Sequence, residues 1–154
     1  EMQGMGTTIV SAALLNETFV LAHVGDSRAY LIQNDQLKQL TDDHSLVNEL
    51  LKSGEITAEM AATHPQKNIL TRSVGVSGQV KIDVSHHHCQ ANDYLLLCSD
   101  GLTNMVSEAD ILSVVTSDQT LESKTKQLIS AANEAGGADN ITVLLIHFEG
   151  AACP

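Results

Sequence analysis

The 154-residue sequence is poor in aromatic and basic residues, and each shortage narrows the class of protein. Aromatic residues make up 3% and tryptophan is absent, so a core has to be built from aliphatic side chains. Eight lysines and arginines against 19 acidic residues give a formal charge of −11. Binding to nucleic acid or to an anionic membrane surface requires positive charge to neutralise phosphates, so this balance argues against both.

Long apolar runs and regularly spaced cysteines are also missing. The longest apolar runs, such as Ile141–Ile146, are far too short to cross a bilayer, and no charged-then-apolar signal segment opens the chain. The three cysteines (Cys89, Cys98 and Cys153) have no C-x-x-C spacing. This usage predicts reduced thiols and a cytoplasmic protein without membrane insertion.

The first forty residues are rich in β-branched and aliphatic side chains. Thr8–Leu15 and Thr18–Val24 are predicted to form a hairpin of largely buried strands around Asn16-Glu17. Ser27–Gln33 and Leu37–Leu40 are predicted to extend it into a meander.

Helix signals follow, and three of the helices begin with a hydroxyl residue that can cap a first turn. The predicted caps are Ser45, Thr57 and Ser107, a further helix is predicted over Thr120–Ala135, and the predicted ends are Gly54, His64-Pro65 and Gly136-Gly137. Extended chain is expected at Lys67–Val74, Lys81–His88, Asp93–Ser99 and Ile141–Phe148. Because strands and helices are segregated rather than alternating, the pattern predicts an α+β fold with mostly antiparallel sheet.

Three aspartates share one local context. Asp26 and Asp100 each follow a very apolar strand, and Asp139 precedes one; all three lie beside glycine or asparagine in a turn. Aspartate and glycine are also ordinary turn formers, which is the simpler explanation for any one of them. In an antiparallel sheet, however, the end of one strand lies beside the start of its neighbour, so the three carboxylates could meet at one rim.

Converging carboxylates repel unless they are protonated or paired with cations, and few basic residues lie near these three. A hard divalent cation would resolve the repulsion, because oxygen ligands favour Mg²⁺ or Mn²⁺ over zinc. Asp26, Asp100 and Asp139 are therefore candidate metal ligands, with ordinary turn formation as the alternative explanation of the same residues.

Six motifs in order carry a family resemblance that covers nearly the whole chain. The sequence resembles the metal-dependent serine/threonine protein phosphatases (the PPM family), above all their compact bacterial members. The motifs are Gly4-Met5-Gly6-Thr7-Thr8, Val24-Gly25-Asp26-Ser27-Arg28, Asp43-His44-Ser45, Asn68-Ile69-Leu70-Thr71-Arg72, Leu96-Leu97-Cys98-Ser99-Asp100-Gly101-Leu102 and Gly136-Gly137-Ala138-Asp139-Asn140-Ile141-Thr142-Val143.

The resemblance implies an antiparallel β-sandwich flanked by helices (α-β-β-α layers), with a Mn²⁺ or Mg²⁺ centre in a cleft. Asp100 and Asp139 match two ligands of the second metal, and Asp26 with Asp100 matches a third, weaker metal site. A metal-activated water, rather than a side chain, would hydrolyse phosphoserine or phosphothreonine. The segment from about Val47 to Ile69 matches a mobile flap, and the substrates would be phosphoproteins of a bacterial kinase.

The match covers only the C-terminal portion of the family's catalytic domain, here residues 1–150 before a tail at 151–154. The family's phosphate-gripping arginine and its bridging Asp-Gly pair have no counterpart, and Gln3 stands where that aspartate would precede Gly4. We therefore predict a sandwich that lacks its N-terminal strands, negligible phosphatase activity for this chain alone, and a hazard of dimerisation or strand exchange through exposed sheet edges.

Other polar residues have simpler interpretations. Arg28 and Arg72 are expected to pair with nearby acids, His44 to cap a helix or contact the flap, and Cys98 to be an inert core thiol. His86–His88 is expected on an exposed strand rim, with His86 and His88 on one face. No residue is assigned to substrate binding.

Two rival functions remain. The first is a catalytically silent PPM-like domain that binds regulatory or phosphorylated partners; the three intact aspartates favour the enzyme over it. The presence or absence of an Asp-Gly pair and an arginine upstream would decide between them. The second is a generic Ca²⁺-stabilised domain, which no D-x-D-x-D-G loop supports.

Overall fold

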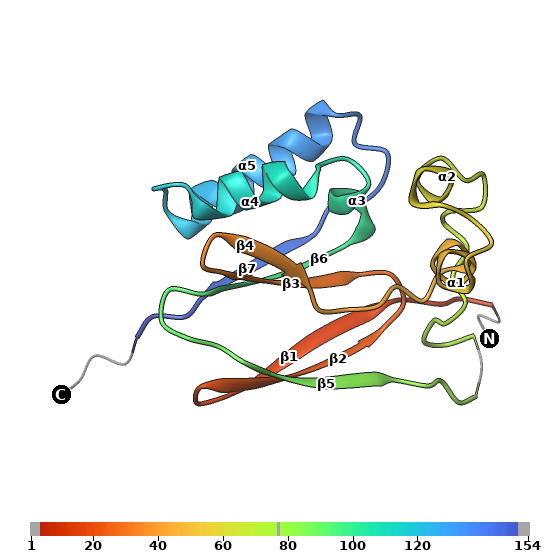
Figure 1. Cartoon of the computed structure of the whole chain (residues 1–154), viewed down its shortest axis with the longest axis horizontal. Helices are drawn as coiled ribbons and strands as arrows, with labels where there is room; N and C mark the ends of the chain where they lie inside the picture. Colours follow the sequence, from red (N-terminus) through yellow and green to blue (C-terminus); the bar gives the residue numbers. More distant parts are fainter. Residues whose placement is uncertain (1–3, 77, 151–154) are drawn as a thin grey trace.

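Two antiparallel sheets stack face to face in a computed structural model that describes residues 4–76 and 78–150 (Figure 1). The predicted tail at 151–154, including Cys153, lies outside the described residues. The smaller sheet has the strand order β1-β2-β5, and the larger has the order β4-β3-β6-β7. The strands are β1 (Ile9–Leu15), β2 (Thr18–Val24), β3 (Arg28–Gln33), β4 (Gln36–Gln39), β5 (Asp83–His88), β6 (Tyr94–Cys98) and β7 (Val143–His147).

The predicted hairpin turns are present, but the predicted meander is wrong. Asn16, Asn34 and Asp35 adopt positive φ angles, as tight turns between paired strands require. Strands β1 and β2 belong to one sheet, whereas β3 and β4 belong to the other. The change of sheet occurs at Gly25, whose φ of 109° lets the chain turn away after β2.

The predicted caps Ser45, Thr57 and Ser107 are confirmed, because each hydroxyl accepts a hydrogen bond from a backbone N–H in the first turn. Thr120 caps α5 in the same way. The sequence did not predict α3, a single turn that directly follows β6. Lys67–Val74 is irregular rather than a strand, and contributes only the single bridges Ser45↔Leu70 and Thr7↔Val74. The helices are α1 (Leu46–Ser53), α2 (Ala58–Ala62), α3 (Asp100–Thr103), α4 (Glu108–Thr116) and α5 (Leu121–Glu134).

The larger sheet is buried on both faces, which explains the unbroken apolar run of β6. Leu95 and Leu97 point toward the smaller sheet and pack with Phe19 and Leu21. The alternate residues Leu96 and Cys98 pack under the helices in a second cluster. That cluster also contains Tyr30, Ile32, Leu102, Ile111, Val115, Leu128, Ala132 and Leu145. Burial raises the pKa of the Cys98 thiol to about 12, as expected of an inert core cysteine.

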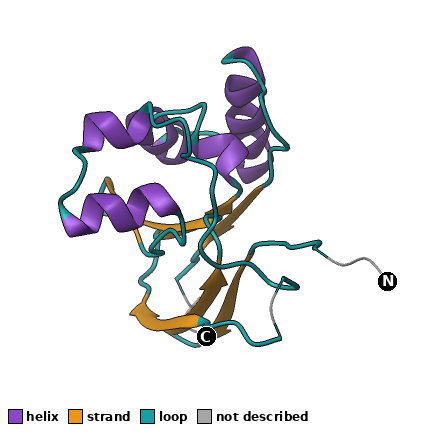
Figure 2. Ribbon diagram, turned by 90° about the vertical axis from the view of Figure 1, so that its right-hand side faces the viewer, coloured by secondary structure: helices purple, strands orange, loops and turns teal. Residues whose placement is uncertain are grey.

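Helices α3, α4 and α5 lie over the larger sheet, while α1 and α2 stand at one end of the sandwich (Figures 1 and 2). The antiparallel sandwich with flanking helices is thus confirmed, and its described residues form three of the four expected layers. Within them, no helix is long and apolar enough to cross a membrane.

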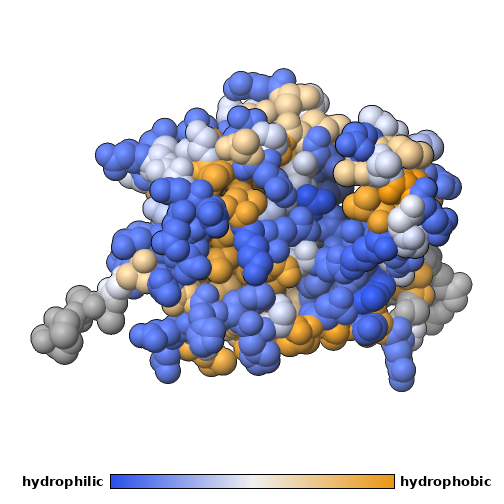
Figure 3. Space-filling model, viewed as in Figure 1, coloured by the Kyte–Doolittle hydropathy of each residue, from blue (hydrophilic) through white to orange (hydrophobic). Residues whose placement is uncertain are grey.

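The outer face of the β1-β2-β5 sheet is exposed, so the prediction that the first hairpin is largely buried is wrong for β1. Ile9, Leu15 and Val84 on this face are 51%, 57% and 58% exposed. Figure 3 shows apolar surface along the edge of the molecule where this sheet lies. His86 and His88 also lie on this face, as predicted, while His87 points inward and its ring packs at a tilt against Phe19.

Candidate metal centre at one rim of the larger sheet

Three neighbouring strands end or begin level with one another at one rim of the larger sheet. Arg28 at the start of β3 pairs with Cys98 at the end of β6, which in turn pairs with Val143 at the start of β7. Asp26 lies just before the start of β3, and Asp100 lies just after the end of β6. Asp139 lies in the loop just before β7, so the structure brings the three predicted aspartates to one rim.

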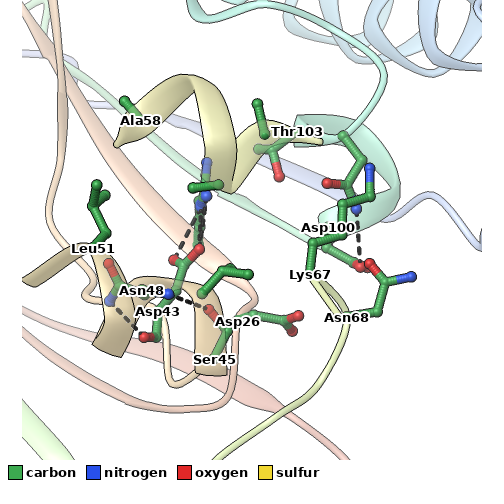
Figure 4. A pocket seen from close by; sticks show the side chains of 15 residues that line it. Asp26, Asp43, Ser45, Asn48, Leu51, Ala58, Lys67, Asn68, Asp100 and Thr103 are labelled. Atoms are coloured by element: carbon green, nitrogen blue, oxygen red, sulfur yellow. Dashed lines mark hydrogen bonds and ion pairs between the residues drawn. The ribbon is translucent and has the colours of Figure 1, made fainter. Parts of the chain in front are cut away.

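Asp26 and Asp100 line a common cavity of about 360 Å³ (Figure 4). The sheet rim and α3 form one side of this cavity, and α1, α2 and the chain after α2 form the other. Asp139 is exposed in the loop before β7 and does not line the cavity. The further lining residues are Arg28, Asp43, Ser45, Val47, Asn48, Leu51, Ala58, Ala61, Ala62, Lys67, Asn68, Thr103 and Asn104.

The loops of Asp100 and Asp139 touch through a glycine. A Cβ atom added at Gly101 would lie 2.4 Å from the carbonyl oxygen of Asn140, so only glycine permits this approach. The Ser99 hydroxyl donates to the same carbonyl oxygen at 2.9 Å and accepts from the Thr142 N–H at 3.0 Å. These contacts fix the position of Asp100 relative to the Asp139 loop.

At the carboxylates of this rim, burial and mutual repulsion outweigh the positive charge of Arg28. Partial burial and the negative charge of Asp100 raise the pKa of Asp26 to about 6. Burial and the charge of Asp139 likewise raise the pKa of Asp100. Each ion therefore destabilises the next, which is the condition that a bound divalent cation relieves. Because the candidate ligand atoms are all carboxylate oxygens, their chemistry fits Mn²⁺ or Mg²⁺.

Arg28 offsets these carboxylates only in part, because its guanidinium is bonded to Asp43. Its Nη2 and Nε atoms lie 2.7 Å and 3.0 Å from the two carboxylate oxygens of Asp43. This pairing confirms the expectation that Arg28 bonds an acid near the Asp26 turn. Among the residues described as lining the cavity, the remaining cation is Lys67, which is exposed on the chain after α2.

A second polar cluster lies behind the Asp26 turn. His23, His44 and Asp83 offer possible metal-ligand atoms within 4.8 Å of one another. Arg72 Nη1 lies 2.8 Å from Asp83 Oδ1 and 3.0 Å from His44 Nε2, so a guanidinium already supplies the positive charge there. The expectation that Arg72 pairs with an acid is confirmed.

Sequence reasoning missed several cavity residues. Asp43 and Asn68 stand inside motifs of the family resemblance, and Lys67 directly precedes one, but their types gave no separate reason to select them. Thr103 and Asn104 reach the cavity because α3 follows β6 without a loop. Asn104 donates a hydrogen bond to Asp100 at 3.2 Å.

The raised pKa of Asp26 predicts a pH-dependent stability in the absence of divalent cations. The pKa of Asp26 in the folded chain, about 6, exceeds the ordinary value of 3.8, so folding favours the protonated carboxyl. The contribution of this group to the free energy of unfolding is therefore fully present below pH 3.8 and is lost as pH rises through 6. With a chelator present, Asp26→Asn should therefore be more stable than wild type at neutral pH, by on the order of 1 kcal/mol after allowance for solvent screening. Urea titrations at about pH 4 and about pH 7 measure this difference. An equal difference at both pH values, or the same effect from the exposed Asp118→Asn control, would contradict the prediction.

Known proteins share this sequence and fold. Residues 1–50 match the family model described as Protein phosphatase 2C. A serine/threonine phosphatase of Listeria innocua is 54% identical over 146 residues, which cover 95% of this chain and 58% of that protein. The structure of the S. agalactiae serine/threonine phosphatase matches with a TM-score of 0.92 and 51% identity, over 95% of this chain and 60% of that one.

A third match bears on the metal. The catalytic domain of the phosphatase PstP, solved in complex with two manganese ions, has a TM-score of 0.84 and 34% identity, over 93% of this chain and 59% of that one. The chain thus spans 58% of the length of its curated Listeria relative. Over nearly its whole length the chain is similar to bacterial serine/threonine phosphatases, and its first fifty residues match the Protein phosphatase 2C (PPM) family.

Proposed function

We propose that this chain supplies part of the metal centre of a protein phosphatase that hydrolyses phosphoserine and phosphothreonine in phosphoproteins. The single observation that carries the proposal is the meeting of Asp26 and Asp100 in one cavity, with Asp139 close enough that its charge raises the pKa of Asp100. Relatives that are 54% and 51% identical are serine/threonine phosphatases. The substrates we infer are those of a bacterial serine/threonine kinase in the cytoplasm.

The residues divide the work at this site. Asp26, Asp100 and Asp139 would hold Mn²⁺ or Mg²⁺, which when bound lowers the pKa of a coordinated water and so supplies the nucleophile. Asn104 orients Asp100 through its hydrogen bond. Arg28 holds Asp43 at the cavity wall, and Lys67 adds a positive charge to the cavity lining. We propose that the segment from Val47 to Ile69, which carries α1 and α2, is a mobile flap over this cavity.

The first test concerns the chain by itself. The 154-residue chain should show negligible Mn²⁺-dependent hydrolysis of p-nitrophenyl phosphate, because three carboxylates without the family's bridging Asp-Gly pair cannot build a binuclear centre. Significant hydrolysis by the purified chain would contradict this.

The second test adds the part of a relative that this chain does not match. The unmatched portion of the Listeria innocua phosphatase, joined to this chain, should give Mn²⁺-dependent phosphate release from phosphoserine and phosphothreonine peptides. Asp100→Asn should lower this rate at least about 100-fold, since it removes a metal ligand, whereas the exposed Asp118→Asn should leave it unchanged. A folded but inactive fusion would support the silent binding domain instead.

A further inference from the structure

His44 is buried where three separate parts of the chain meet, with 3% of its surface exposed. Its backbone N–H donates to the carbonyl oxygen of Gly25 at 3.0 Å, and its own carbonyl accepts from the Thr71 N–H at 2.9 Å. Gly25 immediately precedes Asp26, and Thr71 lies on the chain that returns from α2. One residue is therefore bonded to the metal-site turn and to the returning chain.

The His44 imidazole makes two further hydrogen bonds, one to Gly25 and one to Asp83. The Gly25 N–H donates to Nδ1 at 3.0 Å, and Nε2 lies 3.0 Å from Asp83 Oδ2. Because a backbone N–H can only donate, Nδ1 accepts this bond and carries no proton. The ring proton is therefore on Nε2 and is donated to Asp83 Oδ2. Arg72 Nη1, 3.0 Å from Nε2, is also a donor, so it makes a close contact with Nε2 rather than a hydrogen bond. Arg72 donates to the other oxygen of the same carboxylate. These bonds hold the pKa of Asp83 at about 2, with His44 the larger cause.

The same residues close the neck of segment 46–70, which we define as the chain that leaves His44 and returns at Thr71. Ser45 bridges Leu70, and the Leu46 N–H donates to the Ile69 carbonyl at 2.9 Å. The His23 ring stacks on His44 with centroids 4.7 Å apart and so restricts rotation of the imidazole. Segment 46–70 carries α1 and α2, which form one side of the cavity.

We propose that His44 is a positioning residue that holds the Gly25 peptide, and with it the Asp26 carboxylate, in register with the neck of segment 46–70. His44 bonds both backbone polar groups of Gly25. Its imidazole accepts from the Gly25 N–H, and its own N–H donates to the Gly25 carbonyl oxygen. A displacement of the neck is therefore passed to Asp26 through two hydrogen bonds. The inference rests on the proposed function only for the role of Asp26 as a metal ligand.

Two substitutions test the hydrogen bonds of the two ring nitrogens separately. In His44→Asn the side-chain oxygen stands near the position of Nδ1 and can still accept from Gly25, whereas in His44→Gln the amide nitrogen stands near Nε2 and keeps only the bond to Asp83. NMR of the 154-residue chain measures hydrogen exchange at the Gly25 amide and Mn²⁺-induced broadening at Asp26. We expect His44→Gln to speed exchange about tenfold and to raise the Mn²⁺ concentration needed for broadening severalfold, with His44→Asn within about twofold of wild type.

The outcomes distinguish this inference from its neighbours. If both variants lost Gly25 protection and Mn²⁺ affinity equally, with equal falls in melting temperature, His44 would only fill space in the core and the inference would be overturned. Wild-type protection of the Gly25 amide in His44→Gln would overturn it as well. If wild type shows no Mn²⁺ broadening, the metal assignment fails, while Gly25 exchange still judges the role of His44. Long-range ¹H–¹⁵N spectra of wild type need no variant: we expect the ring proton on Nε2, and a proton on Nδ1 would refute the inference.

Discussion

Replacing Leu96 with alanine is expected to lower the free energy of unfolding by about 2–5 kcal/mol. Leu96 has no exposed surface and stands at the centre of β6, between Tyr30 of β3 and Leu145 of β7. Its side chain packs in the cluster beneath the helices, so the truncation leaves a cavity that neighbours on both sides border. This loss is a large part of the roughly 5–15 kcal/mol that stabilises an ordinary domain. Urea titration of the free energy of unfolding measures it.

Leu144 provides the matched control, because it is a leucine on the adjacent strand and is 52% exposed. Leu144→Ala should change the free energy of unfolding by less than about 1 kcal/mol, since exposed truncations leave no cavity. Comparable losses in the two variants would mean that β6 is not the buried centre of the larger sheet.

Gly101→Ala is expected to cost about 1–3 kcal/mol, the usual range for atoms forced into a packed site. The added Cβ would meet the Asn140 carbonyl at 2.4 Å, and the Ser99 hydroxyl holds that carbonyl in place. Relief of the clash must push the Asp139 loop away from Asp100. The variant should therefore lose metal affinity together with stability, as Mn²⁺ titration and thermal unfolding would show.

Gly78→Ala is the control for the added methyl group, since a Cβ at Gly78 meets nothing within 4 Å. It should leave both stability and Mn²⁺ affinity close to wild type. If Gly101→Ala behaved like Gly78→Ala, the close approach of the two loops would be wrong.

Local sequence signals predicted the elements well because their causes are local. Ser107 and Thr120 cap helices through bonds to residues three positions on, and Asn34-Asp35 turns a hairpin within two residues. The short α3 was missed, since four residues that begin with Asp100-Gly101 carry no helical periodicity.

Long-range choices were harder to predict. The sequence after Val24 gave no sign of which sheet the next strand would join, so β3 was placed beside β2 instead of β6. Burial of β1 was overestimated because its composition suits a buried strand, whereas its exposure depends on what covers the sheet. The amino-acid types alone do not contain that information.

The candidate site was predictable in part for the same reason. Asp26, Asp100 and Asp139 share a local context, and antiparallel pairing then brings them to one rim. The bond network of His44 was not foreseen, because Asp83 and His23 carry no local signal and meet His44 only in the folded chain.

The change of sheet after β2 has a consequence for folding. Two strand pairings join the N-terminal and C-terminal halves of the chain: β2 with β5 (Thr18↔His88) and β3 with β6 (Arg28↔Cys98). Both can form only after the long connection that carries α1 and α2 has brought its two ends together. Such non-local pairing slows the folding reaction, because the chain loses entropy before the strands gain contacts. Loop-closure entropy grows only logarithmically, so each doubling of a connection's length costs about 0.6 kcal/mol. Insertions or deletions between α1 and α2 should thus be inexpensive, and this stretch is free to diverge in length among homologues while the two sheets keep their register.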